Sequence, residues 1–263
     1  MKICFSKYQG TGNDFILIDN RDKSFPSENI SLVEKLCDRR FGIGCDGLML
    51  LENEEGFDFK MRYFNSDGKE GSMCGNGGRC IVAFAYHLNI IKDKTHFIAV
   101  DGEHFANISF QDNQPIVSLQ MQNVSVIENG ENFYYLNTGS PHYTTFIANH
   151  DNFDTFSEGK AIRYNKRFKE IGTNVNFISG DNNHIHVSTY ERGVEDETYS
   201  CGTGVVASSI AAKLQFKPES NHFYVKTLGG NLEVSFDYKK DNKFENIWLK
   251  GPACFVFNGE VEF

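Results

Sequence analysis

The chain has 263 residues, which fits either one large domain or two medium ones and is long enough to bury a sizeable core. Apolar residues make up 40% of the chain and charged residues 23%, the proportions of a folded globular protein, although 24 Phe are unusually many. The formal net charge is −9 and no basic run occurs, which argues against a nucleic-acid-binding surface; small molecules or proteins are the expected partners.

The N-terminal stretch and the cysteines bear on the cellular compartment. MKICFSKYQG has one early Lys and then three apolar residues, far short of the roughly 7–15 of a secretory signal, and no run approaches the ~18 of a membrane helix. The seven cysteines form no Cys-x-x-Cys and the eight His are scattered, which fits a reducing compartment and no zinc site. We expect a cytoplasmic protein without membrane or metal, whose Cys4, Cys37, Cys45 and Cys254 are small buried hydrophobes.

Short strands dominate the predicted elements. FDFKMRYFN (57–65) alternates Phe57, Phe59, Met61 and Tyr63 on one face, the period of a half-buried strand. Helical spacing predicts helices at 28–40, with Ser27 as N-cap, at 80–88 and at 205–214. Further strands are predicted at 15–19, 48–52, 96–100, 107–110, 116–122, 133–137, 184–193, 222–227, 232–236 and 247–251. Turn residues between so many strands favour antiparallel, barrel-like sheets.

Two short motifs, SMCGNGGRC (72–80) and SCGTGVV (200–206), repeat a Cys-Gly-x-Gly tetrapeptide almost half a chain apart. Each follows a predicted strand and a polar connection and precedes a predicted helix. In both copies a Tyr precedes the cysteine by eleven positions (Tyr63, Tyr190) and a Glu by four (Glu70, Glu197). The pattern predicts an α+β chain of two similar halves, each a sheet wrapped on one main helix, with a boundary near 115–120.

A cysteine at a helix start has distinctive chemistry. The first N–H groups of a helix lack intrahelical acceptors, and the peptide dipoles leave partial positive charge there. A thiol at that point can have its pKa lowered from about 8.5 toward roughly 3.5–7.5, and nearby glycines let a carboxylate approach the backbone. Two such thiols suit a reaction in which one removes a proton from carbon and the other delivers one from the opposite face. Cys80, further into the helix, is expected to be a packing residue.

Other classes fit the same residues less well. A P-loop and a dinucleotide fingerprint are both absent. A cysteine hydrolase could use His142 in GSPHY as its base, but it leaves the second motif unexplained. A duplicated binding module would explain the glycines but not why a thiol precedes both.

The quoted motifs, together with GTGNDFILID, FNSDGKEGSMCGNGGRC, TNVNF and YERGVEDETYSCGTG, resemble the diaminopimelate epimerase family along the whole chain. Proline and hydroxyproline epimerases share the two-cysteine plan and are the alternative. The resemblance implies two pseudo-symmetric domains, each a β-barrel-like sheet around a central helix, with the active site in the cleft between them. It also implies that the last strand returns to the first domain, which gives domains of 1–117 plus 250–263 and 118–249.

The reaction implied is the interconversion of LL- and meso-2,6-diaminopimelate, a step toward lysine and cell-wall precursors, without pyridoxal phosphate or metal. The resemblance implies that Cys74 and Cys201 are the two acid/base residues. It also implies that His142 and Glu191 tune the pKa of these cysteines. It leaves monomer and homodimer both open. The substrate-contacting positions that it implies are Asn13, Asn65, Gly75, Asn76, Asn174, Glu191, Arg192, Gly202 and Thr203.

Two positions depart from the family pattern. Many members have Asn where this chain has Ser140, before Pro-His, and Gln where it has Gly47. Both departures concern the expected contacts to the distal end of the substrate, for which water or a neighbouring side chain could substitute.

Overall fold

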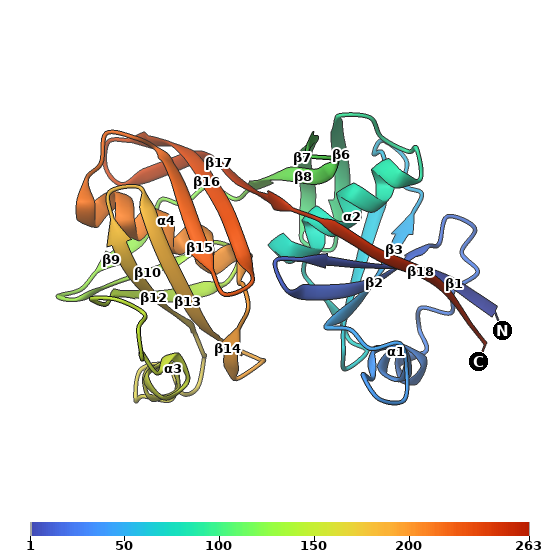
Figure 1. Cartoon of the computed structure of the whole chain (residues 1–263), viewed down its shortest axis with the longest axis horizontal. Coiled ribbons are helices and arrows are strands. Elements are labelled where there is room, and N and C mark those ends of the chain that lie inside the picture. The colour runs from blue at the N-terminus through green and yellow to red at the C-terminus, as the bar shows by residue number, and fades with distance from the viewer. Residues whose placement is uncertain (1, 263) are drawn as a thin grey trace. The chain divides into compact units, whose positions relative to one another are not determined.

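The computed structural model describes residues 2–262 and divides the chain into two compact units. Unit 1 comprises Met1–Leu119 and Gly251–Phe263, and unit 2 comprises Gln120–Lys250. Figure 1 follows the chain from blue to red, so the red C-terminal strand β18 in unit 1 marks where the chain returns.

Unit 1 holds two helices and the strands at both ends of the chain. Its elements are β1 (Lys2–Gly10), β2 (Asn13–Asp19), α1 (Ile30–Cys37), β3 (Gly47–Glu52), β4 (Lys60–Asn65), β5 (Glu70–Gly71), α2 (Gly75–His87), β6 (Lys94–Ala99), β7 (Gly102–Gln111), β8 (Gln114–Met121), whose end passes into unit 2, and β18 (Cys254–Glu262).

Unit 2 holds the remaining elements. They are β9 (Ile127–Asn129), β10 (Phe133–Asn137), β11 (Pro141–Phe146), α3 (Thr155–Arg163), β12 (Asn174–Asp181), β13 (His184–Glu191), β14 (Asp196–Thr198), α4 (Gly202–Phe216), β15 (His222–Thr227), β16 (Gly230–Lys239) and β17 (Lys243–Pro252), whose end passes into unit 1.

The two units have the same strand order. In unit 1 the neighbours run β18-β1-β2-β3-β4-β6-β7-β8, with β5 added to β4. In unit 2 they run β9-β10-β11-β12-β13-β15-β16-β17, with β14 added to β13. Parallel and antiparallel pairings fall at the same places, so the predicted α+β fold with two similar halves is confirmed.

The helices cover opposite faces of each sheet. In unit 1 the side chains of α1 pack against alternate residues of β2, β3 and β4, in a cluster that includes Leu36, Ile16, Leu48 and Phe64. The other face of these strands receives α2, and Figure 1 shows α1 and α2 on opposite sides of them. In unit 2, α3 takes the place of α1 and α4 the place of α2.

The last strand lies in the sheet of unit 1, the arrangement that the family resemblance implies. β18 pairs antiparallel with β1, from Lys2 opposite Glu262 to Gln9 opposite Cys254. The first and last described strands of the chain are therefore neighbours in the sheet of unit 1.

The expected antiparallel sheets also contain parallel strand pairs. β2 and β3, and likewise β11 and β12, are parallel and are joined through a helix. The same holds for β4 with β6 and β13 with β15. A helix that connects two strands carries the chain back to the end at which it started, which makes the pairing parallel.

One helix prediction needs correction, and one helix was not predicted. The helix predicted at 28–40 spans only Ile30–Cys37, and its N-cap is Asn29, whose side chain accepts a hydrogen bond from the Leu32 N–H. Ser27 instead accepts a hydrogen bond from Arg62. The helix α3 was not predicted at all, because TFSEGKAIR carries few apolar residues at helical spacing.

The matched tyrosines are not structural equivalents. Tyr63 lies opposite Met49 on the α2 face and packs edge-on against Phe15, whereas Tyr190 lies in the cluster under α3. The residue of unit 1 that corresponds to Tyr190 is Phe64, which faces α1. The turn after β13 holds one more residue than the turn after β4, because Phe64 pairs with Glu70 and Tyr190 with Glu197. The matched glutamates are therefore equivalent, and the matched tyrosines are a coincidence.

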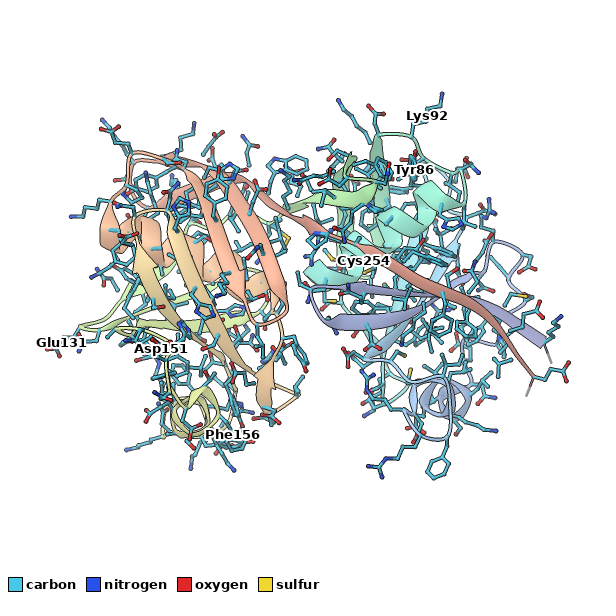
Figure 2. The ribbon with its side chains drawn as sticks, viewed as in Figure 1. Tyr86, Lys92, Glu131, Asp151, Phe156 and Cys254 are labelled. Carbon is cyan, nitrogen blue, oxygen red and sulfur yellow. The ribbon has the colours of Figure 1, made fainter. Side chains whose placement is uncertain are left out.

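The cysteine predictions are partly wrong. Cys37 and Cys45 are buried, as is Cys80, but Cys4 is exposed and lies 3.5 Å from a Glu260 carboxylate oxygen. Cys254, labelled in Figure 2 at the start of β18, is half-buried and accepts a hydrogen bond from the Gln114 amide. Strand alternation places Cys4 on the solvent side of β1.

Within residues 2–262, no helix is both long enough and apolar enough to cross a membrane.

Candidate functional site

The two motif cysteines occupy the same position in the two units. Cys74 is the N-cap of α2 and Cys201 the N-cap of α4, and both have the extended backbone that N-cap residues adopt. The sequence predicts each thiol at or just before the start of a helix, and the two N-cap positions confirm this prediction. Gly75 and Asn76 in α2, and Gly202 and Thr203 in α4, therefore supply the first N–H groups of their helices, where anions bind favourably.

The two thiols differ in their immediate contacts. The Sγ of Cys74, which is half-buried, accepts a hydrogen bond from the Gly77 N–H at 3.2 Å. The Sγ of Cys201, only 7% exposed, lies 3.5 Å from the Thr203 hydroxyl oxygen instead. The thiols thus share a backbone position but have different hydrogen-bonding environments.

There is little room for a side chain three residues after each cysteine. A Cβ at Gly77 would lie 3.1 Å from the Cys74 Sγ and 3.3 Å from the sulfur of Met49. A Cβ at Gly204 would lie 2.4 Å from the amide oxygen of Asn176, so this position has even less room. The shared contact also identifies Met49 and Asn176 as equivalent residues of β3 and β12.

In unit 1 the predicted residues Asn13 and Asn76 are joined by a hydrogen bond. The Asn76 side-chain amide donates to the Asn13 carbonyl oxygen at 3.3 Å, and the Asn13 amide donates to a carboxylate oxygen of Asp46 at 2.6 Å. The Asn76 carbonyl oxygen in turn accepts from Arg79 at 3.0 Å. Both amides therefore have one defined orientation.

Asn13 is hydrogen-bonded to a network of charged residues through Asp46. Asp14 pairs with Lys7 and Arg39, and Arg39 also pairs with Asp46. Burial disfavours the ionised Asp14, but the hydrogen bonds from Arg39 and Lys7 outweigh it and lower its pKa to about 2. Asp14 is therefore ionised at neutral pH.

Asn65, the remaining predicted residue of unit 1, lies at the exposed end of β4. It is opposite Gly47 of β3, and its side-chain nitrogen lies beside Gly71. A Cβ at Gly47 would come within 2.5 Å of the Tyr63 ring, so Tyr63 fills the space that a larger residue at 47 would need. The Gly47 departure from the family pattern is thereby accommodated within this chain.

In unit 2, His142 connects to Cys201 through Thr203. The Nε2 of His142 lies 2.9 Å from the Thr203 hydroxyl oxygen, which contacts the Cys201 Sγ. On the other side of the ring, the Asn176 amide donates to Nδ1 at 3.0 Å, and the Asn176 carbonyl oxygen accepts from Thr189. Because Nδ1 accepts a hydrogen bond, Nε2 carries the proton and donates to Thr203.

His142 is neutral. It is fully buried, and burial, with a smaller contribution from the nearby charge of Arg192, lowers its pKa to about 3 despite the hydrogen bond from Asn176. It can therefore orient the Thr203 hydroxyl toward the cysteine, but it brings no positive charge at neutral pH.

The other predicted residues of unit 2 gather around the same strand ends. The Asn174 amide donates to the Ser140 hydroxyl at 2.9 Å and to the carbonyl of Pro141, while its own carbonyl oxygen accepts from the Arg192 backbone N–H. Ser140 therefore contacts a predicted substrate-binding residue despite its short side chain. Glu191 accepts a hydrogen bond from Thr198, and the exposed Arg192 guanidinium donates to the carbonyl of Ile171.

The predicted residues divide between the two units. Unit 1 holds Asn13, Asn65, Cys74, Gly75 and Asn76, and unit 2 holds His142, Asn174, Glu191, Arg192, Cys201, Gly202 and Thr203. Among residues 2–262, no group of three or more His, Cys, Asp or Glu side chains is arranged to hold a metal ion.

Sequence reasoning missed Arg79, Asp46, Asn176 and Thr189. For Asn176 a signal was present, because Asn174 and Asn176 in TNVNF alternate along a strand and so face the same side. For the other three, only the tertiary hydrogen bonds reveal a connection to the site.

A family model described as diaminopimelate epimerase matches the chain twice, over residues 5–127 and 134–256. The chain belongs to the diaminopimelate epimerase family. The protein named diaminopimelate epimerase from Flavobacterium psychrophilum is 56% identical over 97% of this chain and 98% of its own length. Proteins of the same name from Chlorobaculum tepidum and Aquifex aeolicus are 41% and 36% identical, each with at least 96% of both chains covered.

Solved structures outside the diaminopimelate epimerase family share this fold. A phenazine biosynthesis protein of the PhzF family from Bacillus anthracis matches with a TM-score of 0.77 at 16% identity, covering all of both chains. A hydroxyproline epimerase from Agrobacterium vitis matches with a TM-score of 0.70 at 14% identity, covering 99% of this chain and 92% of that one. These likenesses concern the fold alone.

Proposed function

We propose that this protein interconverts LL- and meso-2,6-diaminopimelate by moving the α-proton between two cysteines, without a pyridoxal cofactor. One thiolate of the pair Cys74 and Cys201 takes the proton, and the other thiol donates one to the opposite face of the carbon. In each direction the cysteines exchange protonation states, so the next turnover begins from the reverse arrangement.

One observation supports this proposal most strongly. Two units of identical topology each present a cysteine as the N-cap of the equivalent helix, and a glycine three residues later leaves room beside it. A single-cysteine hydrolase would give no reason for the second cap. We therefore propose that each unit is one epimerase half and contributes one base.

The helix starts suit the charge that develops during the reaction. As the α-proton leaves, negative charge spreads onto the substrate carboxylate, and preorganised N–H groups stabilise such charge without further reorganisation. We assign this role to the first backbone N–H groups of α2 and α4, at Gly75, Asn76, Gly202 and Thr203. Asn13, Asn65, Asn174, Glu191 and Arg192 are proposed to contact the rest of the substrate, with the Arg192 guanidinium suited to a carboxylate.

A thiol pair also limits where the enzyme can work. Both cysteines must stay reduced to carry protons, so we propose a reducing compartment such as the cytoplasm. The small, zwitterionic substrate is the proposed partner, and sedimentation of the purified chain distinguishes monomer from homodimer.

The test is proton exchange in D₂O. Protein treated with a chelator and a thiol reductant, incubated with LL-diaminopimelate, should form the meso isomer and incorporate deuterium at the α-carbon, followed by NMR. Cys74→Ala and Cys201→Ala should each lower the rate of epimerisation by at least about a thousandfold, as expected when one of two required acid–base groups is lost.

Cys80→Ala is the matched control, since Cys80 is buried in the same helix as Cys74 and burial raises its pKa well above the ordinary value. That variant should keep its activity if it folds. Deuterium entry with proline or hydroxyproline but not with diaminopimelate would instead favour the proline-type racemase. Release of ammonia from an amide substrate would favour the hydrolase.

A further inference from the structure

An arginine at the end of α3 holds a carboxylate next to the turn that carries Arg192. Arg163 is the last residue of α3, which Figure 1 shows beside β13 and β14. Its Nη2 donates to a carboxylate oxygen of Glu195 at 3.2 Å, and its Nη1 donates to the carbonyl of Phe168 at 3.3 Å. The Arg163 side chain is 12% exposed and that of Glu195 30%, so this ion pair is partly shielded from water.

Glu195 belongs to the same tight turn as Arg192. The turn joins Glu191 at the end of β13 to Asp196 at the start of β14, and the Glu195 N–H closes it by donating to the Glu191 carbonyl at 2.7 Å. The Glu195 carboxylate bends back onto the turn, where it accepts from the Gly193 N–H at 3.1 Å. It therefore lies beside the residue that follows Arg192.

Arg163 and Arg192 are close neighbours beside Gly172. A Cβ at Gly172 would lie 2.5 Å from the Cδ of Arg192 and 3.2 Å from the Cζ of Arg163. Both cations are therefore near the Glu195 carboxylate, and Arg163 is the one that pairs with it.

Among the described residues, 2–262, the Arg192 guanidinium forms no ion pair. It is exposed, and it donates to the carbonyl of Ile171 at 3.3 Å, which carries no charge. An exposed guanidinium without a carboxylate from its own chain can bind one from a ligand, in the forked geometry that suits the two groups.

The other carboxylates of this turn also have partners. Glu191 accepts from the Thr198 hydroxyl at 2.9 Å, and Asp196 accepts from the next backbone N–H at 2.7 Å. Glu195 differs from them because its partner is a cation. Its pairing is therefore the one that a lost positive charge would change.

We propose that Arg163 is a positioning residue that keeps Arg192 available for the distal carboxylate of the substrate. By pairing with Glu195, Arg163 removes an intramolecular carboxylate that would otherwise compete with the substrate for Arg192. It also neutralises a negative charge that would repel an incoming carboxylate. This inference rests on the proposed function, which assigns Arg192 to a substrate carboxylate.

Kinetics with diaminopimelate test this role. Arg163→Met leaves Glu195 without its cation, so Glu195 should pair with Arg192 and KM should rise at least about threefold. The kcat should stay within about twofold, because the change concerns binding away from the reacting carbon. Arg163→Met combined with Glu195→Gln also removes the competing carboxylate, and this double variant should have the KM of the wild type.

The double variant separates competition from simple bracing of the turn. An ion pair that merely held α3 to the turn would be lost in both variants, so KM would be raised in both. A double variant with a KM as high as that of Arg163→Met would therefore overturn the inference. Arg163→Lys keeps a positive charge beside Glu195, and its KM should stay close to that of the wild type.

Arg167→Met is the matched control. Arg167 lies in the same loop after α3 and forms an ion pair with Glu128 at 2.6 Å. Loss of this pair should leave KM unchanged. A rise of KM equal to that of Arg163→Met would show that the effect is common to the arginines of the loop, which contradicts the proposed role of Glu195.

Chemical modification of Arg192 tests the pairing without substrate. The full chain is treated with phenylglyoxal, which reacts with accessible guanidinium groups, and mass spectrometry follows the Arg192 peptide with the exposed Arg40 as internal reference. Arg163→Met should slow the modification of Arg192 at least about threefold, because an ion pair with Glu195 then protects it. Glu195→Gln, alone or combined with Arg163→Met, should give the wild-type rate.

An Arg192 modified at the wild-type rate in a folded Arg163→Met variant would refute the inference. Should that variant fail to fold, as judged by circular dichroism, the KM of Glu195→Gln decides: a wild-type value supports competition, and a raised value supports bracing and rejects the proposal. A protein inactive on diaminopimelate but with the expected modification rates would refute the proposed function and not the pairing of Arg163 with Glu195.

Discussion

At the scale of single residues, the two cysteines are surrounded by unlike polar groups although their helices are equivalent. Next to Cys201 the buried His142 is neutral and relays a hydrogen bond through Thr203. In unit 1 the buried Arg79 lies on the helix that Cys74 caps and donates to the side chain of Asn76. In unit 2, His142 of β11 lies opposite Asn174 of β12. The equivalent pair in unit 1 is Phe15 and Gly47, so the hydrogen-bond relay has no counterpart there. The two units therefore share a backbone arrangement but differ in the polar side chains near their cysteines.

His142 predicts a pH-dependent stability. Its pKa is about 3 in the folded chain and about 6.5 in the unfolded chain, so the unfolded chain binds the proton more tightly. The neutral ring contributes its full stability above pH 6.5, and this is lost as pH falls from 6.5 toward 3. At about 1.4 kcal/mol for each pH unit, His142 alone should lower the free energy of unfolding by about 2 kcal/mol between pH 7.5 and 5.0.

Urea unfolding at both pH values measures this difference. The control is His142→Phe, because Phe15 is the equivalent residue of unit 1. The unfolding free energy of this variant should change less over the same pH range. His150, whose pKa burial lowers to about 4, adds to the loss in both proteins and cancels in the comparison. Equal changes in wild type and variant would contradict a buried neutral His142.

The site residues could be predicted from sequence only where a motif marks them. Cys74 and Cys201 stand in repeated tetrapeptides before helices, so their cap positions followed from the sequence. Arg79 in GGRC gave no signal, because its partners Thr11 and Pro252 are far away in sequence and carry no charge. A buried cation held by neutral acceptors leaves no complementary acidic residue to search for.

At the scale of elements, α3 shows how closely a helix can be packed on its sheet. A Cβ at Gly159 would lie 2.3 Å from the Cβ and 2.7 Å from the Cγ of Tyr190 on β13. The Tyr190 Cβ is attached directly to the strand, so it cannot move aside without the backbone. Phe156, on the same helix and labelled in Figure 2, also packs on the Tyr190 ring.

Gly159→Ala should therefore destabilise the protein. Alanine favours a helix over glycine by about 1 kcal/mol, but overpacking against β13 costs typically 1–3 kcal/mol or more, and we expect a net loss of about 1–2 kcal/mol in urea unfolding. Ala161→Lys, at an exposed position of α3, should change stability by less than about 0.5 kcal/mol. A stabilised Gly159→Ala would show that α3 can lift from the strand at little cost.

Elements with a clear period were predictable, and those decided by tertiary contacts were not. The strands β2, β3 and β10 lie where alternation or apolar runs in the sequence predict them. β12 is buried over six successive residues and therefore shows no alternation, and α3 shows little apolar periodicity because only Thr155 and Gly159 are buried. The parallel pairings were missed because they depend on which helix joins which strands.

At the scale of the whole molecule, the fold is one topology used twice, with a single exception in connectivity. The edge strand beside β10 is β9, which precedes it closely in the chain, whereas the edge strand beside β1 is β18, from the other end. Unit 1 thus depends on a distant segment for its outer strand, and unit 2 does not.

Removing β18 should therefore affect the units unequally. In a chain ending at Ala253, hydrogen exchange followed by mass spectrometry should show faster exchange in β1 and β2, while β12, β13 and α4 keep most of their protection. Addition of a peptide of residues 254–262 should restore part of the protection of β1. Loss of protection in both units together would show that they unfold as one cooperative body.

The pairing of β1 with β18 also has a consequence for synthesis on the ribosome. The strands β1 to β7 leave the ribosome first, but the edge of β1 stays unpaired until residues 254–262 emerge, after all of unit 2 has been made. An unpaired edge is a template for pairing with other chains, so the nascent protein spends most of its elongation with this hazard exposed. Unit 2, which has no such wait, can reach its native sheet while unit 1 is still incomplete.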